Sequence, residues 1–205
     1  LSAGFVASSG QNNKEALNNQ RKKVDNSFDA LLQYQKKSNI DIANKILYDL
    51  KNKREAITSI SLNASQSSSY FTSVIYDFFQ YYRNILFKSE VTTIKNQLLA
   101  HYWLIFGKEN LGQLRANLNA TFTKNNFVEN DYFNFAVSFG AFNINKNKFL
   151  VIAPENVTTS FKNSFKGEAV DKTFSMIEVA KAKAMEGNFG IDSSIWFSNV
   201  SATID

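Results

Sequence analysis

Apolar residues recur along most of the chain at intervals of three and four positions, which is the spacing of one face of an α-helix. The clearest run lies between residues 14 and 37, where charged and amide side chains occupy the other faces. Its apolar positions are Leu17, Val24, Phe28, Leu31 and Leu32. This pattern predicts an amphipathic helix that packs in a bundle.

Shorter patterns flank this helix. Residues 1–9 read as the end of a helix, which Gly10 and the polar residues after it stop. Asp41 is placed to cap a second amphipathic helix, and the Ser- and Asn-rich segment 63–69 ends that helix as a turn between antiparallel neighbours. The stripe of this second helix is Ile42, Ile46, Leu50, Ile57 and Ile60.

Aromatic residues crowd the segment from Tyr70 to Phe87 on more than one side, which predicts a helix in the centre of the bundle. Ser89 and Glu90 open or bend the next helix, which continues to about Lys124. A helix of about 34 residues spans roughly 50 Å, longer than a compact globule of this size needs. We therefore expect an elongated antiparallel helical bundle, or two stacked bundles that share long helices.

Breaks divide the rest of the chain into four segments. Asn125 and Asn126 close the long helix, and the helix that begins after Asn130 ends near Pro154. A short helix or turn over residues 157–165 and a longer helix after Gly167 follow. The apolar positions of that longer helix are Val170, Phe174, Ile177 and Met185, and the glycines at 187 and 190 break it. Asp192 caps a last helix that carries Trp196, Val200 and Ile204.

The composition supports an all-α class. The 205 residues include one proline and eight glycines, and 44% are hydrophobic, which disfavours a turn-dense sandwich or barrel. This length suits one domain with a substantial core, and we predict a single domain over residues 1–205.

Because Leu1 is not a start methionine, we expect a piece of a longer protein whose membrane anchor lies beyond either end. No run approaches the roughly 20 apolar residues of a membrane span.

The charge pattern disfavours nucleic acid as a partner. The net charge is +5 and the pI is about 9.2, but the lysines are scattered singly and in pairs. Cysteine is absent, which excludes disulfides, thiolate metal sites and cysteine nucleophiles. No glycine-rich phosphate loop and no metal-binding motif is recognisable, so we expect neither cofactor nor metal.

A catalytic set cannot be assembled from the sequence, and we expect no enzyme. His101 is the single histidine, so neither a metal-binding histidine pair nor a choice of general bases exists. Its neighbours Tyr102 and Trp103 favour a packed or interface histidine over a ligand.

The segment from Lys108 to Asn117 is the best candidate for a binding site. Arg115 lies beside an apolar stripe of the long helix and should be half-buried, and Lys108, seven residues earlier, shares its side. Gly112 lies between them and has no side chain, so a neighbouring helix or a small ligand can approach the backbone there. Two aligned cations repel unless an anion or acids from a neighbour lie between them. The alternative is a structural ion pair, but Glu109, six residues from Arg115, does not face it on a regular helix.

Three segments carry a family resemblance. LSAGFVASSG at residues 1–10, with the following NQRKKVD at 19–25, resembles the start of the nitrate- and nitrite-sensing domain. KENLGQLRANLNATF at 108–122 resembles that family's "KE-x-x-G-x-x-RA" helix. DSSIWF at 192–197 through TID at 203–205 resembles its closing helix. The resemblance covers the whole chain in order.

The resemblance implies an all-helical sensor domain, usually extracytoplasmic, of bacterial receptors such as methyl-accepting chemotaxis proteins, histidine kinases and cyclases. Members sense nitrate and nitrite through arginines on different helices, and Arg115 matches the arginine of the second motif. The family's first motif, "ERG", contains another arginine, which would fall upstream of residue 1. The second anion-binding arginine that the resemblance implies therefore lies outside this chain. Leu114 replaces an acid that often precedes the second arginine.

The resulting hypothesis is the extracytoplasmic (periplasmic) sensor domain of a transmembrane chemoreceptor, which binds a small anion, nitrate or nitrite, as a homodimer. The site residues are Arg115, Lys108 and Gly112. The alternative is a helical protein-interaction module, or the sensor domain of a histidine kinase, with no nitrate binding. Neither the output domain nor the choice between nitrate and another small anion such as formate follows from the sequence.

Overall fold

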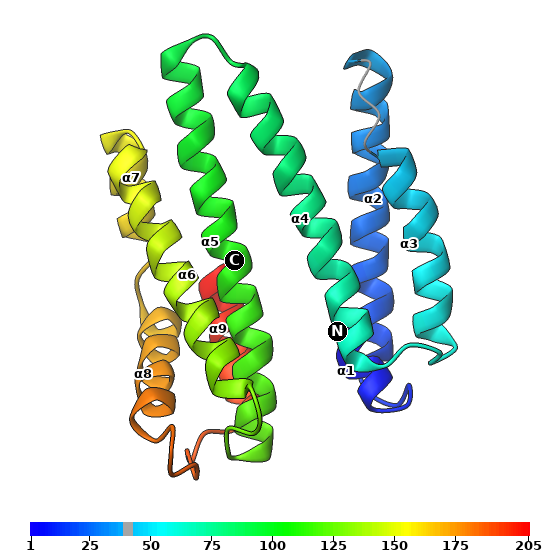
Figure 1. The fold of residues 1–205 in the computed structure, drawn as a ribbon, viewed down its shortest axis with the longest axis vertical. Coiled ribbons are helices and arrows are strands. Elements are labelled where there is room, and N and C mark those ends of the chain that lie inside the picture. The colour runs from blue at the N-terminus through cyan, green and yellow to red at the C-terminus, as the bar shows by residue number, and fades with distance from the viewer. Residues whose placement is uncertain (39–42) are drawn as a thin grey trace. The chain divides into compact units, whose positions relative to one another are not determined.

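The computed structural model describes residues 1–38 and 43–205, and all regular structure in these residues is α-helical (Figure 1). The expected all-α class is thus confirmed. The helices are α1 Ser2–Ala7, α2 Lys14–Ser38, α3 Ala43–Thr58, α4 Ala64–Lys88, α5 Thr92–Lys124, α6 Asp131–Ile152, α7 Glu155–Ser164, α8 Glu168–Ala182 and α9 Ser193–Ile204. The chain divides into two compact units, Leu1–Gln80 and Tyr81–Asp205, and the division falls within α4.

Unit 1 packs α1, α2, α3 and the first part of α4 around two small cores. One core joins Phe5 and Val6 of α1 to Leu17 of α2 and Ile57 of α3. The other consists of Phe28, Ile46 and Leu50, with Val24, Leu31 and Leu32 packed against it. The apolar stripes predicted for the first two long helices are therefore the faces that meet. Asp41 and Ile42, the proposed cap and first stripe position, lie outside the described residues.

The connection between α3 and α4 is shorter than the sequence suggests. The predicted break over residues 63–69 is wrong, because α4 already begins at Ala64. The Asn63 side chain accepts from the Gln66 amide at 2.8 Å, and the Gln66 side chain accepts from the Asn63 amide at 2.9 Å. This reciprocal cap satisfies two amide groups at the helix start, so the Ser-rich segment that follows can be helical. Ile60 has a φ of 57° in the preceding turn and is not part of the stripe.

The aromatic composition of α4 suggests a helix that is buried on all sides, but the structure leaves part of its surface exposed. Phe79 and Leu86 are buried, but Tyr76 is 53% exposed and Phe87 is 66% exposed. Aromatic residues at successive positions necessarily point in different directions around a helix, so one packed face cannot cover them all. The expectation of a central, enclosed helix is wrong for these side chains.

Unit 2 is organised around α5, the 33-residue helix expected between residues 90 and 124. Helix α6 returns alongside α5, and α9 packs against α5 and α8 (Figure 1). Buried Asn145 of α6 donates to Asn110 of α5 at 2.7 Å. The core of the unit consists of Leu111, Leu114, Leu118, Phe122, Phe135, Phe142, Ile177, Ala180, Phe189, Trp196 and Val200. Each fully buried leucine or phenylalanine contributes roughly 1.5–3 kcal/mol through removal of apolar surface from water.

The helix ends of unit 2 follow the polar and glycine signals in the sequence. Asn125 ends α5 in the left-handed conformation, with φ 56°. Helix α6 ends just before Ala153 and Pro154, and α7 begins at Glu155. Asp192 caps α9, accepting from the amides of Ser194 and Ile195 at 2.7 and 3.3 Å. One assignment is wrong, because α8 ends at Ala182 and Met185, 95% exposed, lies beyond it.

Helix α6 is apolar on two opposite faces. Phe135, Phe142 and Phe149 are buried in unit 2. The opposite face carries an exposed row with spacings of four and three, the heptad pattern of a helix–helix seam. This seam consists of Phe133, Val137, Gly140, Ile144, Asn147 and Val151. Its four large apolar side chains are 52–84% exposed.

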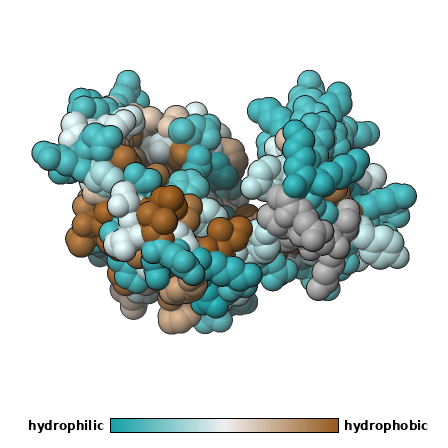
Figure 2. Space-filling view, turned by 90° about the horizontal axis from the view of Figure 1, so that it is seen from above, coloured by the Kyte–Doolittle hydropathy of each residue, from teal (hydrophilic) through white to brown (hydrophobic). Residues whose placement is uncertain are grey.

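The two units differ in surface character on the face that Figure 2 shows. In Figure 2, hydrophilic colours prevail over the lobe formed by α2 and α3, whereas hydrophobic residues gather in patches on the other lobe. Among the described helices, none is both long enough and apolar enough to span a bilayer.

Candidate functional site

Arg115 sits on the long helix α5 at the edge of the unit 2 core. Leu114 and Leu118, one position before it and three after it, are completely buried. Arg115 itself is half-buried, as the sequence predicts. The helix periodicity thus holds the start of its side chain against the core and leaves the guanidinium near the surface.

Helix α9 contacts the guanidinium of Arg115 through two side chains. The Nη1 group donates to the hydroxyl of Ser201 at 2.9 Å, and the guanidinium carbon lies 4.9 Å from the centre of the Phe197 ring. The fully buried Trp196 donates from Nε1 to the main-chain oxygen of Arg115 at 2.9 Å. The structure therefore brings together the second and third sequence segments that resemble the family.

The electrostatic surroundings of Arg115 leave its charge without a close partner. Burial lowers the pKa of the guanidinium, while the carboxylates of Asp205 and Glu109 raise it. The arginine stays protonated at neutral pH, because a guanidinium loses its proton only under strongly alkaline conditions. Within the part of the chain that the structure describes, the ion pairs within 4 Å do not include Arg115. A half-buried cation of this kind can accept an external anion.

Glu109 acts on Arg115 at a distance and not as an ion-pair partner. Its carboxylate accepts from the Gln113 side chain at 3.0 Å, one turn along α5. Burial raises the pKa of Glu109, and the hydrogen bond from Gln113 and the charge of Arg115 oppose that rise. The six-residue spacing thus excludes a direct pair on this helix but does not remove the electrostatic coupling.

Lys108 and Gly112 lie on the same side of α5 as Arg115, because positions 108, 112 and 115 are one and two turns apart. Lys108 is exposed. A methyl group at Gly112 would meet no atom of the described residues within 4 Å, so the space next to that backbone is open in this part of the chain. Two cations therefore flank an open stretch of helix surface.

His101 is held by a tyrosine. The Tyr82 hydroxyl lies 2.9 Å from His101 Nδ1 and 3.2 Å from the main-chain oxygen of Leu98, and the two rings are 5.5 Å apart. His101 is nevertheless exposed, so Tyr82 contacts it at the surface and the histidine is not packed in the core. Among the described residues, no group of three His, Cys, Asp or Glu side chains could hold a metal ion.

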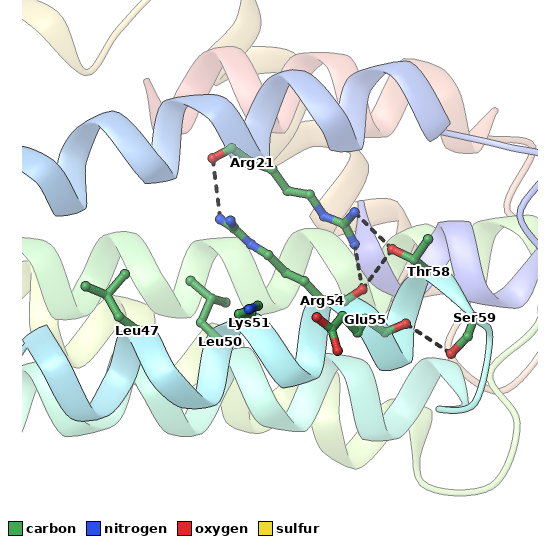
Figure 3. Close-up of a pocket in the computed structure, with 8 residues that line it drawn as sticks. All are labelled: Arg21, Leu47, Leu50, Lys51, Arg54, Glu55, Thr58 and Ser59. Atoms are coloured by element: carbon green, nitrogen blue, oxygen red, sulfur yellow. Dashed lines mark hydrogen bonds between the residues drawn. The ribbon is translucent and has the colours of Figure 1, made fainter.

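A second cationic cluster, which the sequence reasoning missed, lies in unit 1. Arg21 of α2 and Arg54 of α3 line a cavity of about 560 Å³ (Figure 3). The sequence places Arg21 on a polar helix face. The chain has only four arginines, and this scarcity is the one sequence signal that points to Arg21 and Arg54. The pairing itself depends on how α2 and α3 align across 33 residues of chain, which periodicity does not specify.

The two arginines of this cluster differ in their acid partners. Arg54 pairs with Asp25 at 2.6 Å. Arg21 donates to the Thr58 hydroxyl at 3.1 Å and to the main-chain oxygen of Arg54 at 3.2 Å. Burial lowers the pKa of Arg21, the charge of Arg54 lowers it further, and Asp25 raises it.

A family model described as "Nitrate and nitrite sensing" matches residues 1–205, the whole chain. No curated protein and no solved structure matches the chain.

Proposed function

The chain belongs to the nitrate- and nitrite-sensing family, and on that premise we propose that it binds nitrate or nitrite at Arg115. We further propose that it is the extracytoplasmic sensor domain of a bacterial transmembrane chemoreceptor of the methyl-accepting type. In this role it binds and reports a ligand and performs no chemistry on it. Residues 1–205 act together as one sensor domain.

The single observation that carries the binding proposal is that Arg115 is a half-buried cation that forms no ion pair with the described residues. Its guanidinium is half-buried, hydrogen-bonded to one hydroxyl and without a carboxylate within ion-pair distance in the described residues. Nitrate is planar and singly charged, and a guanidinium can offer it two parallel N–H donors. Partial burial strengthens that interaction because less water competes with it.

Lys108 and Gly112 complete the proposed site on the same helix side. The open space beside Gly112 admits an anion close to the α5 backbone, and Lys108 adds a second positive charge.

Helix α9 is the element that would report binding. It contacts the guanidinium through Ser201 and Phe197, so an anion that draws Arg115 away changes the packing of α9 on α5. Shifts of about 1–2 Å between packed helices are a common form of signal transmission.

Homodimer formation is part of the proposal. We assign the exposed seam of α6 as the shared face, because a heptad row of Phe133, Val137, Ile144 and Val151 fits a second copy of itself. Sedimentation should show Ile144→Glu as a monomer under conditions in which the parent chain and Asn134→Glu, a charge placed off the seam, are dimers. A dimer unaffected by Ile144→Glu would place the interface elsewhere.

Calorimetric titration of nitrate and nitrite into the full-length protein tests the binding site. Arg115→Ala should weaken binding by about 10- to 100-fold, the loss of a charged hydrogen bond of roughly 1.5–3 kcal/mol. Arg115→Lys keeps the positive charge but loses the planar pair of N–H donors, so its nitrate affinity should lie between those of the parent and of Arg115→Ala. Arg83→Ala, which removes an exposed arginine, is the control. Equal affinity in Arg115→Ala and Arg83→Ala would exclude Arg115 as the site.

A further inference from the structure

The cavity of unit 1 has the lining of a site for a small organic anion. Cationic side chains come from both helices, Arg21 from α2 and Lys51 and Arg54 from α3 (Figure 3). Glu55 is the one acidic residue of the lining. The lining is therefore positive overall, and it attracts anions before any specific contact forms.

Arg21 and Arg54 hold this charge in place by a reciprocal contact. Arg21 donates from Nη2 to the main-chain oxygen of Arg54 at 3.2 Å, and Arg54 donates from Nη2 to the main-chain oxygen of Arg21 at 3.4 Å (Figure 3). Each guanidinium has five N–H donors, so both retain donors for a ligand. Preorganised donors bind an anion at a smaller entropic cost than mobile side chains do.

The charges of the cluster are incompletely balanced. Asp25 lies at 2.6 Å from Arg54, and no carboxylate of the described residues forms an ion pair with Arg21. The two like-charged guanidinium groups repel each other, and partial burial increases that repulsion. A bound carboxylate would relieve it.

Apolar side chains form another part of the lining. Leu47 and Leu50 of α3 contribute hydrocarbon surface, and Thr58 and Ser59 contribute hydroxyl groups. The volume of about 560 Å³ falls within the usual range for small-molecule sites, roughly 300–1,000 Å³. An inorganic ion such as nitrate would leave most of this space and its apolar wall without contact. The fit is to an anion with a hydrocarbon body.

We propose that the cavity formed by α2 and α3 binds a small organic monocarboxylate, with the carboxylate at Arg21 and Lys51 and the apolar body on Leu47 and Leu50. This site is separate from Arg115, which lies in the other unit. It gives the chain a second ligand class.

Benzoate is a suitable probe, and amide chemical shifts of the whole chain report where it binds. We expect saturable shifts in α2 and α3 with a Kd in the millimolar range or tighter. Benzyl alcohol, which has the same ring without the charge, and acetate, which has the charge without the ring, should each bind at least about tenfold more weakly. Nitrate should not shift these residues at equal concentration.

Lys51→Gln tests the charge without breaking the contact between the two arginines, because Lys51 is exposed and takes no part in it. Benzoate affinity should fall about threefold to tenfold in Lys51→Gln and remain unchanged in Lys36→Gln, which removes an exposed lysine of α2. The Arg115→Ala variant should bind benzoate as the parent does.

The proposal is overturned by any of three results: no benzoate shifts in α2 and α3, equal binding of benzyl alcohol, or nitrate binding there more tightly than benzoate. Equal benzoate affinity in Lys51→Gln and Lys36→Gln overturns the assigned charge contact.

Discussion

Arg115 on α5 donates from its Nη1 group to the hydroxyl of Ser201 on α9, 86 residues further along the chain, over 2.9 Å. The contact joins two segments that carry the family resemblance, and it is made at the edge of a core in which Trp196 is completely buried. The position of α9 is therefore coupled to a half-buried candidate cation that forms no ion pair with the described residues.

Removal of the Ser201 hydroxyl should cost stability. Ser201→Ala leaves an Nη1 donor of Arg115 without its acceptor, and we expect the free energy of unfolding to fall by about 1 kcal/mol. Ser198→Ala, at an exposed position of the same helix, should change it by less than about 0.5 kcal/mol. Urea denaturation measures both. A similar change in both variants would mean that the hydroxyl contributes nothing specific.

Substitution of Gly112 by alanine should have opposite effects on stability and on nitrate binding. A methyl group at this position meets none of the described residues within 4 Å, so Gly112→Ala should stabilise α5 by about 0.5–1 kcal/mol through the higher helix propensity of alanine. The same methyl group occupies the space proposed for the anion and should weaken nitrate binding. Thermal unfolding and calorimetry measure the two effects. Unchanged nitrate affinity in this more stable variant would remove Gly112 from the site.

Gly187 and Gly190 should respond differently to the same substitution. Both have a positive φ, 65° and 69°, so alanine is strained at either position by about 1 kcal/mol. At Gly187 the added methyl group would also lie 2.9 Å from the main-chain oxygen of Asn125, whereas at Gly190 it meets nothing within 4 Å. We expect Gly187→Ala to lower the urea midpoint clearly more than Gly190→Ala. Equal midpoints would show that the loop moves to relieve the contact.

Asp192 should make the stability of unit 2 depend on pH. Hydrogen bonds from the Ser194 side chain and from the amides of Ser194 and Ile195 lower the pKa of its carboxyl group. A lowered pKa in the folded state stabilises the fold above the usual aspartate pKa of about 3.9, and this stabilisation is lost as the pH falls through the folded value. Asp192→Asn keeps an oxygen that caps the helix but does not titrate.

The measurement for this prediction is the midpoint of thermal unfolding between pH 7 and acid conditions. The advantage of the parent chain over Asp192→Asn should be greatest near neutral pH and should disappear as the acid range is reached. A difference between the two proteins that does not vary with pH would show that ionisation of Asp192 makes no contribution.

Most helix positions could be predicted because they depend on local signals. The spacing of Leu17, Val24 and Phe28 indicates the buried face of α2, and Asn125 and Pro154 mark helix ends through their own backbone preferences. The start of α4 could not be placed from composition. A Ser- and Asn-rich segment suits either a turn or a helix start, and the reciprocal bonds of Asn63 and Gln66 decide for the helix.

The candidate sites likewise have some features that the sequence predicts and others that depend on how the helices pack. Half-burial of Arg115 follows from its angle to the stripe of α5, a property of the sequence and of helix geometry alone. Its contact with Ser201 and the reciprocal contact of Arg21 and Arg54 do not follow, because each depends on how two helices align. By itself the sequence determined the all-α class, the helix faces and the family. Only the tertiary structure decided which cations meet and which lack an acid, since ion pairing requires contact in space between residues far apart in the chain.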